Sequence, residues 1–197
     1  MNSNKFYENE YIETDFFDIS YKEENLTNKY FGECQFKNCD FTKTDFSNTS
    51  FENCIFENCN LSLIKLNNSK LIGVKFKTSK LLGVHFNNCN IFIMEIDFNT
   101  CYIQYCNFSN LKLMERKFEN CDILECDFIE ADLEKASFKN SKLTGTVFED
   151  SNLTKANFIN AKEYNINMEK NIIKKAEFSF PDVISLLDSF DIKIVNN

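Results

Sequence analysis

Nine cysteines and a single histidine are the residues of this chain that could ligate a soft metal or act as nucleophiles. Within each half of the chain the cysteines recur at spacings of five residues or multiples of five, as in Cys34 and Cys39 or Cys54 and Cys59. Thiol pairs at short spacings can form zinc sites, and a thiol beside an imidazole can act in nucleophilic catalysis. Which chemistry applies depends on where the backbone places each thiol.

A five-residue period in the sequence, called the beat below, determines where the backbone places each thiol. Every fifth residue from Phe31 to Ile91 is Phe, Leu or Ile, and the same holds from Phe98 to Phe158 after a slip of two residues. A period of five fits neither an α-helix nor a flat strand. A chain that turns by about 90° every five residues points each of these residues, here called centres, inward; four sides then give a coil of about twenty residues that stacks as a solenoid.

The cysteines follow this beat, because all nine occupy a second, small inward position two residues before a centre. We therefore interpret them as packed free thiols. Stacking of Cys34 on Cys54, and of Cys106 on Cys126, would also permit disulfides, but the odd number of cysteines and the absence of a signal-peptide pattern favour a reducing cytoplasm. His85 takes an outward position, so no Cys–His pair is expected, and we expect neither enzymatic activity nor a metal or cofactor.

At this point the chain resembles the pentapeptide repeat family, whose pattern is a small residue, Asp or Asn, Leu or Phe, and two variable residues. The segments 131–135 (ADLEK), 151–155 (SNLTK) and 39–43 (CDFTK) match it. The resemblance implies an all-β fold: a right-handed quadrilateral parallel β-helix, with a short C-terminal helix added here. We expect a repeat domain over residues 1–178, with degenerate repeats in 1–30 and the register slip near 92–97, followed by a C-terminal segment over 179–197.

Near the start of that final segment lies Pro181, which suits the first turn of a helix. Val183, Leu186, Leu187 and Phe190 have helical spacing, and Ile192 and Ile194 alternate as in a short strand. The beat itself decays here: it places Glu163, Met168, Ile173 and Phe178 at centres. A terminal coil exposes core and backbone edges. The six apolar tail residues from Val183 to Ile194 are therefore predicted either to cap their own rod or to join two protomers.

Two outward-facing surfaces are candidates for binding. The first is acidic and comprises Asp122, Glu125, Asp127, Glu130, Asp132, Glu149 and Asp150. The second is apolar and comprises Leu63, Leu82, Tyr102, Tyr105 and Leu124. The formal net charge is −8, so direct binding of nucleic acid is not expected, and no apolar run approaches the length of a membrane span.

The decaying repeat, the Pro-initiated helix and the Ile/Val ending resemble the quinolone-resistance (Qnr-type) and microcin-immunity branch of the family. That resemblance implies a homodimer joined through the C-terminal segment, and a rod that binds DNA gyrase or topoisomerase IV as a mimic of duplex DNA and protects it from quinolones or a gyrase-targeting toxin. The alternative is an interaction scaffold whose partner is unrelated to topoisomerases and which uses the apolar surface.

Overall fold

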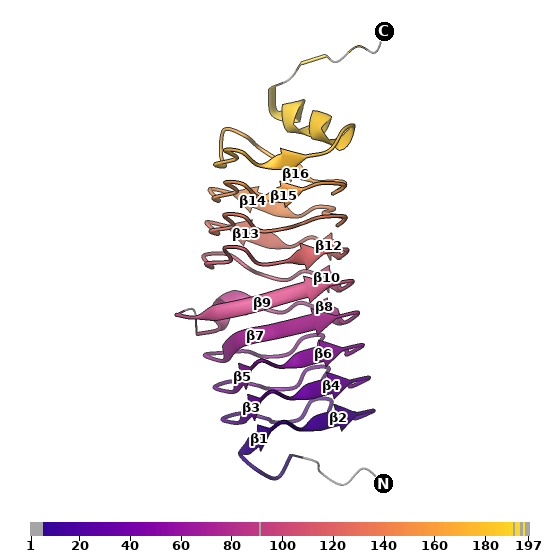
Figure 1. Cartoon of the computed structure of the whole chain (residues 1–197), viewed down its shortest axis with the longest axis vertical. Coiled ribbons are helices and arrows are strands. Elements are labelled where there is room, and N and C mark those ends of the chain that lie inside the picture. Colours follow the sequence, from indigo (N-terminus) through magenta and orange to yellow (C-terminus); the bar gives the residue numbers. More distant parts are fainter. Residues whose placement is uncertain (1–5, 91, 191, 194, 196–197) are drawn as a thin grey trace.

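The computed structural model describes residues 6–90, 92–190, 192–193 and 195 and shows a straight rod of stacked coils, with the two chain ends at opposite ends of the rod (Figure 1). Short strands form its walls: β1 (Glu10–Ile12), β2 (Asp15–Phe17), β3 (Tyr30–Gly32), β4 (Gln35–Lys37), β5 (Ser50–Glu52), β6 (Ile55–Glu57), β7 (Lys70–Lys77), β8 (Lys80–Leu82), β9 (Met94–Asn99), β10 (Tyr102–Gln104), β11 (Phe118–Glu119), β12 (Asp122–Leu124), β13 (Asp127–Ile129), β14 (Val147–Glu149), β15 (Asn157–Phe158), β16 (Asn165–Ile166) and β17 (Glu177–Phe178). Two 3-10 helices, η1 (Phe86–Asn88) and η2 (Asp182–Phe190), complete the elements.

Neighbouring coils pair in parallel, and the paired residues are twenty apart in sequence. Phe36 pairs with Phe16 below it and Phe56 above it, and Phe128 pairs with Phe148 in the same way. This register keeps every centre above a centre, so the predicted parallel β-helix is confirmed.

The corners between walls depend on a left-handed backbone two residues after each centre. Asn38 has φ 56°, Asn58 has φ 52° and Glu130 has φ 54°. This conformation is uncommon outside glycine, but it lets corner amides bond to the next coil: the backbone N–H of Asn38 donates to the carbonyl of Glu57 at 3.0 Å. Where corner asparagines stack, their side chains also bond, as Asn58 Nδ2 does to Asn38 Oδ1 at 2.7 Å.

The core contains a continuous column of phenyl rings on one wall. Phe16, Phe36, Phe56, Phe76, Phe98, Phe118, Phe138, Phe158 and Phe178 stack at centroid separations between 4.6 and 5.4 Å, with each ring within 20° of parallel to the next. Rings on adjacent walls meet edge to face, as Phe118 and Phe128 do at 5.4 Å. Offset-stacked and edge-to-face pairs are the arrangements that aromatic rings prefer.

The small inward positions have a shared structural task. Cys54 Sγ donates to the carbonyl of Phe31 at 3.2 Å, Ser69 Oγ to that of Phe46 at 2.7 Å, and Thr49 Oγ1 to that of Leu26 at 2.6 Å. Each donor therefore ties its coil to the coil below. Cys, Ser and Thr are interchangeable there because each is small and carries a donor.

At the two-residue slip, the extra residues bulge outward from the wall and stay outside the core. Across it Phe76 pairs with Phe98, twenty-two residues later, and Leu71 pairs with Met94. Phe92 is 93% exposed and Ile93 is 59% exposed; this segment is the small projection where β9 begins in Figure 1. Ile91, the predicted centre, lies outside the described residues, and Met94 takes the inward place. The five-residue period assigns only one residue to each corner position, so it does not predict which residues form the bulge.

Near the C-terminal end the beat fails because one coil is shorter by two residues. Phe148 pairs with Ile166, eighteen residues later. The prediction of Glu163 and Met168 as centres is therefore wrong: Glu163 is exposed, whereas Tyr164 and Ile166 are buried. The Glu163 carboxylate instead accepts a hydrogen bond from Thr144 and forms an ion pair with Lys142 at 3.2 Å.

Both rod ends are covered by their own chain. At the N-terminal end the Phe6 ring lies against five described rings, including Phe16 at 4.8 Å and Tyr21 at 4.9 Å. At the C-terminal end η2 buries Leu186. The open core that a solenoid leaves at each end is thereby shielded from water.

Candidate interaction surfaces

The acidic surface is assembled from one coil and the coil above it. Asp122 lies on β12 and Asp127 on β13, with Glu125 at the corner between them. Glu130 occupies the next corner, and its backbone N–H donates to the carbonyl of Glu149 at 2.9 Å. Since Asp127 pairs with Val147, the residues Glu149 and Asp150 lie directly above residues 129 and 130. The structure thus brings all the predicted acidic residues to one end of the rod, over three walls.

Lysines neutralise some of these carboxylates and leave others free. Glu149 forms an ion pair with Lys170 at 2.5 Å, and Asp132 accepts hydrogen bonds from Asn152 and from its own turn. In the same region Lys135 donates to Glu115 at 2.7 Å and holds the pKa of that carboxyl below its usual value.

Among the described residues, five of the seven predicted carboxylates have neither an ion pair with a lysine or arginine nor a side-chain hydrogen bond: Asp122, Glu125, Asp127, Glu130 and Asp150. They form the unpaired acidic set, in which Asp122, Glu125, Glu130 and Asp150 are exposed and Asp127 is half-buried. Unscreened carboxylates on neighbouring corners produce a local negative potential that a net charge of −8 spread over the whole rod would not produce.

The apolar surface lies on the wall whose centres are Leu81, Ile103 and Ile123. Gln104 pairs with Leu82 below and Leu124 above, so the three outward side chains form one column. Leu63 and Tyr105 flank this column at the corner, 44% and 58% exposed. Tyr102, on β10, donates its hydroxyl to Gln104 at 2.8 Å. All five predicted residues therefore lie on one wall.

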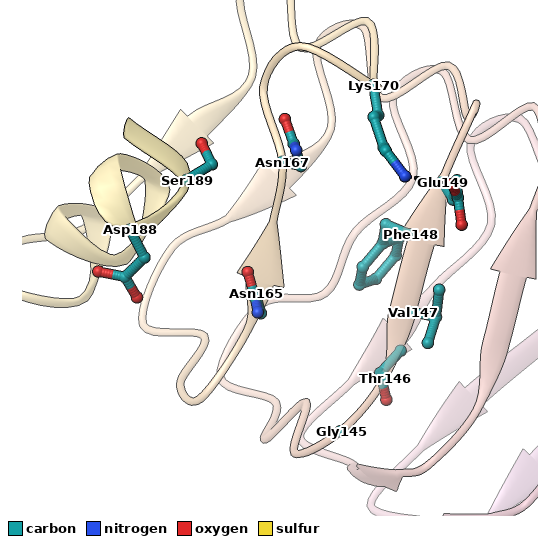
Figure 2. Close-up of a pocket in the computed structure, with 10 residues that line it drawn as sticks. All are labelled: Gly145, Thr146, Val147, Phe148, Glu149, Asn165, Asn167, Lys170, Asp188 and Ser189. Atoms are coloured by element: carbon teal, nitrogen blue, oxygen red, sulfur yellow. Dashed lines mark hydrogen bonds and ion pairs between the residues drawn. The ribbon is translucent and has the colours of Figure 1, made fainter. Parts of the chain in front are cut away.

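A cavity of about 430 Å³ lies between β14 and η2 (Figure 2). Asn165, Asn167 and Lys170 line it from the shortened coil, and Asp188 lines it from the helix. Figure 2 shows the Lys170 side chain pointing to Glu149, with which it forms an ion pair. Sequence reasoning missed this cavity because it assumed coils of constant length; the acidic Glu163 at a predicted centre was the available signal.

The residues predicted for dimerisation separate into two groups. Leu186 is buried, and Val183 packs against the core from a half-buried position. Leu187 is half-buried, whereas Phe190 and Ile192 are exposed, at 44% and 55%. Ile194 lies outside the described residues, and residues 192, 193 and 195 form no strand. The helix thus covers its own rod with one face and exposes apolar side chains on another.

The thiols are inward-facing and the histidine is exposed. All nine cysteines are free and buried, and burial raises the pKa of the Cys89 thiol to about 12, which suppresses the reactive thiolate. Within the described ranges no three His, Cys, Asp or Glu side chains are grouped so that they could hold a metal ion. No described helix has the length and apolar character needed to cross a membrane.

Comparison with known proteins identifies the family. A family model described as the pentapeptide repeat region matches residues 29–108 and 111–180. The chain belongs to the pentapeptide repeat family. No curated protein sequence matches this pentapeptide repeat chain.

Solved structures share the fold. Full-length QnrB1, described as a plasmid-mediated fluoroquinolone resistance protein, aligns with a TM-score of 0.65 and 16% identity over 90% of this chain and 100% of its own. A trypsin-treated QnrB1 aligns with a TM-score of 0.63 and 17% identity over 100% and 96% of the two chains. HetL, from the cyanobacterium Nostoc sp. strain PCC 7120, gives a TM-score of 0.43 and 15% identity over 87% and 90%. At these identities the likeness concerns the fold alone.

Proposed function

We propose that this pentapeptide repeat rod is a non-enzymatic protein that binds a type II topoisomerase, DNA gyrase or topoisomerase IV, and protects it from quinolones or from a gyrase-targeting toxin. The proposal is supported by a rod that aligns with all of QnrB1, a fluoroquinolone resistance protein. It also follows from the resemblance of the tail to the quinolone-resistance branch of the family.

The unpaired acidic set is the observation on which the proposal depends most. A topoisomerase binds duplex DNA, which carries about one negative charge per 1.7 Å. A rod about 40 Å long would need roughly twenty net negative charges to match that density, and the chain has only eight. Mimicry must therefore be local. Glu130 and Asp150 occupy the same corner in successive coils, which are about 4.8 Å apart, and Asp122, Glu125 and Asp127 continue the surface round the rod.

Self-association belongs to the same proposal. The C-terminal end exposes Phe180, at 80%, together with Phe190 and Ile192. Apolar side chains gathered at one end of a rod are suited to an interface between two copies. Leu186 and Val183 already serve as a cap, so such a joint would use the outer face of η2 and the residues after it.

A supercoiling assay tests the proposal. Bacterial gyrase is inhibited with ciprofloxacin, and the protein is titrated over a broad range; we expect recovery of supercoiling. A charge variant (Asp127→Asn, Glu130→Gln and Asp150→Asn) should lose most of that recovery. A control variant (Glu13→Gln and Glu33→Gln) neutralises exposed carboxylates at the same type of corner near the other end of the rod and should retain recovery.

The absence of both recovery and inhibition at every concentration would contradict the proposal and favour the second candidate, an interaction scaffold for an unrelated partner. The apolar surface favours that candidate, because mimicry of duplex DNA does not require exposed leucine and tyrosine side chains.

A further inference from the structure

The apolar surface is a local departure from an otherwise polar wall. Along the column just after the centres, the residues in successive coils are Ser62, Leu82, Gln104, Leu124 and Thr144. The column is polar at both ends, where Ser62 is 5% exposed, and leucine takes two of the three middle positions, on either side of Gln104. Folding does not require the leucines, since the centres Leu61 and Leu143, next to Ser62 and Thr144, are as fully buried as Leu81, Ile103 and Ile123.

Aromatic side chains make this region suitable for binding. Tyr105 is 58% exposed at its corner, and Tyr102 is 36% exposed beside it. Lys80 lies over the Tyr102 ring, with Nζ 5.9 Å from the centroid. Tyrosine provides a large contact area at a small cost in side-chain entropy and is enriched among the residues that dominate interfaces.

The charges next to the apolar surface differ between its two ends. Lys80 lies at the end nearer the N-terminus and faces Tyr102, whereas Asp122 and Glu125 lie at the other end. Lys142 is the ladder neighbour of Asp122 but its ammonium pairs with Glu163 at 3.2 Å, so neither Asp122 nor Glu125 forms an ion pair among the described residues. Gly145 makes room for the Glu125 carboxylate, because a Cβ at residue 145 would lie 2.7 Å from its carboxyl carbon. A partner that covers the apolar surface therefore meets unpaired negative charge at one end.

The backbone N–H groups at the described corners of this wall already donate to the next coil. The N–H of Gly83 donates to Gln104, that of Tyr105 to Leu124, and that of Glu125 to Thr144. A partner cannot add a strand in the middle of the rod and must bind through side chains. From Leu63 to Glu125 the surface spans three coil steps of about 4.8 Å, or about 14 Å, which is the length of about ten helical residues at 1.5 Å each.

We propose that this wall binds a basic amphipathic helix of a partner protein, with its apolar face on Leu82, Tyr105 and Leu124 and its Lys or Arg side chains against Asp122 and Glu125. This inference goes beyond the topoisomerase proposal, because it adds the apolar surface next to Asp122 and Glu125 of the unpaired acidic set and names the chemistry of the bound segment.

Fluorescence anisotropy with a labelled model helix tests it. The probe is a peptide of about fourteen residues with leucines at every third or fourth position and lysines elsewhere; a matched peptide replaces the leucines with serines. A triple variant carries Leu82→Ser, Leu124→Thr and Tyr105→Asn, which are residues that this rod already uses at equivalent positions, as in Ser62, Thr144 and Asn110. Its thermal unfolding should match the wild type.

We expect the triple variant to bind the leucine peptide at least about tenfold more weakly. Asp122→Asn with Glu125→Gln should weaken binding by about threefold to tenfold at low salt and less at high salt. Met114→Ser, which alters an exposed side chain on the opposite wall, should leave binding unchanged. Equal affinity of wild type and triple variant, or equal affinity of the leucine and serine peptides for the wild type, would overturn the inference. The assay contains no topoisomerase, so its failure leaves the proposed function standing.

Discussion

Replacing Phe128 with alanine should be among the most destabilising single changes in the rod. The Phe128 ring is fully buried and stacks on Phe108 at 4.8 Å and on Phe148 at 5.2 Å. It also meets Phe118 and Phe138 edge to face at 5.4 and 5.6 Å. Four ring contacts therefore disappear together, in the middle of a stack whose backbone cannot collapse without breaking the coil register.

The expected cost can be worked from this packing. A buried Phe→Ala change costs about 3–5 kcal/mol, and the four ring contacts place Phe128 at the upper end of that range. For a chain of 150–250 residues each kcal/mol lowers the melting temperature by about 2–4 °C, so a decrease of roughly 10–20 °C is expected. Phe128→Leu keeps an apolar side chain of the kind found at Leu133 and should cost about 1 kcal/mol.

Phe178 provides the matched control. It has a stacked neighbour on one side only, Phe158 at 5.0 Å, and it is half-buried at the end of the column. Phe178→Ala should cost about 1–2 kcal/mol. Thermal unfolding followed by circular dichroism compares the three variants. Equal losses at Phe128 and Phe178, or a loss of only a few degrees at Phe128, would refute the argument from coil stacking.

Three further changes test other parts of the structure. The buried Tyr164 hydroxyl has no hydrogen-bond partner in the described structure, and burial raises its pKa from 10.0 to about 12. Because this tyrosine ionises first in the unfolded chain, the free energy of unfolding should fall by about 2–3 kcal/mol between those two pH values. In urea unfolding, Tyr164→Phe should show neither this loss at high pH nor any loss of stability at neutral pH. The Lys135 ion pair lowers the pKa of Glu115, so its small contribution is present above pH 4.5 and is lost as pH falls through the lowered value; melting curves of Glu115→Gln and wild type should differ slightly at neutral pH and converge in acid. Leu187→Glu with Phe190→Glu should give a folded monomer by light scattering if the tail joins two protomers, whereas an unchanged mass with a lower melting temperature would show that the tail only caps.

The sequence was sufficient for the repeating part of the rod because each centre is chosen by the same inward environment. Phe98 and Phe128 could be placed on their walls before the structure was known, since a two-residue slip can be absorbed only outside the core. The i, i+20 ion pair of Lys135 with Glu115 follows from the same stacking. The apolar surface could be predicted in the same way, because residues twenty apart on a wall must be neighbours.

What the sequence could not predict depends on local departures from the beat. The inward place near the slip belongs to Met94, and near the C-terminal end to Tyr164 and Ile166. One coil can be two residues shorter when a neighbouring segment is longer by the same amount. A constant five-residue period cannot predict where such a change in coil length occurs. The cavity beside Lys170 is lined by residues of the shortened coil, Asn165 and Asn167 among them.

The most direct test of the proposed function is a DNA cleavage assay with gyrase and ciprofloxacin. Quinolones trap gyrase on cleaved DNA, so the amount of linear plasmid measures the trapped complex. The account predicts that the wild-type rod lowers the linear fraction in a concentration-dependent way, that Glu13→Gln with Glu33→Gln does so equally, and that neutralising Asp127, Glu130 and Asp150 abolishes most of the effect. A linear fraction that stays constant with all three proteins would contradict the proposal that this acidic surface protects a topoisomerase.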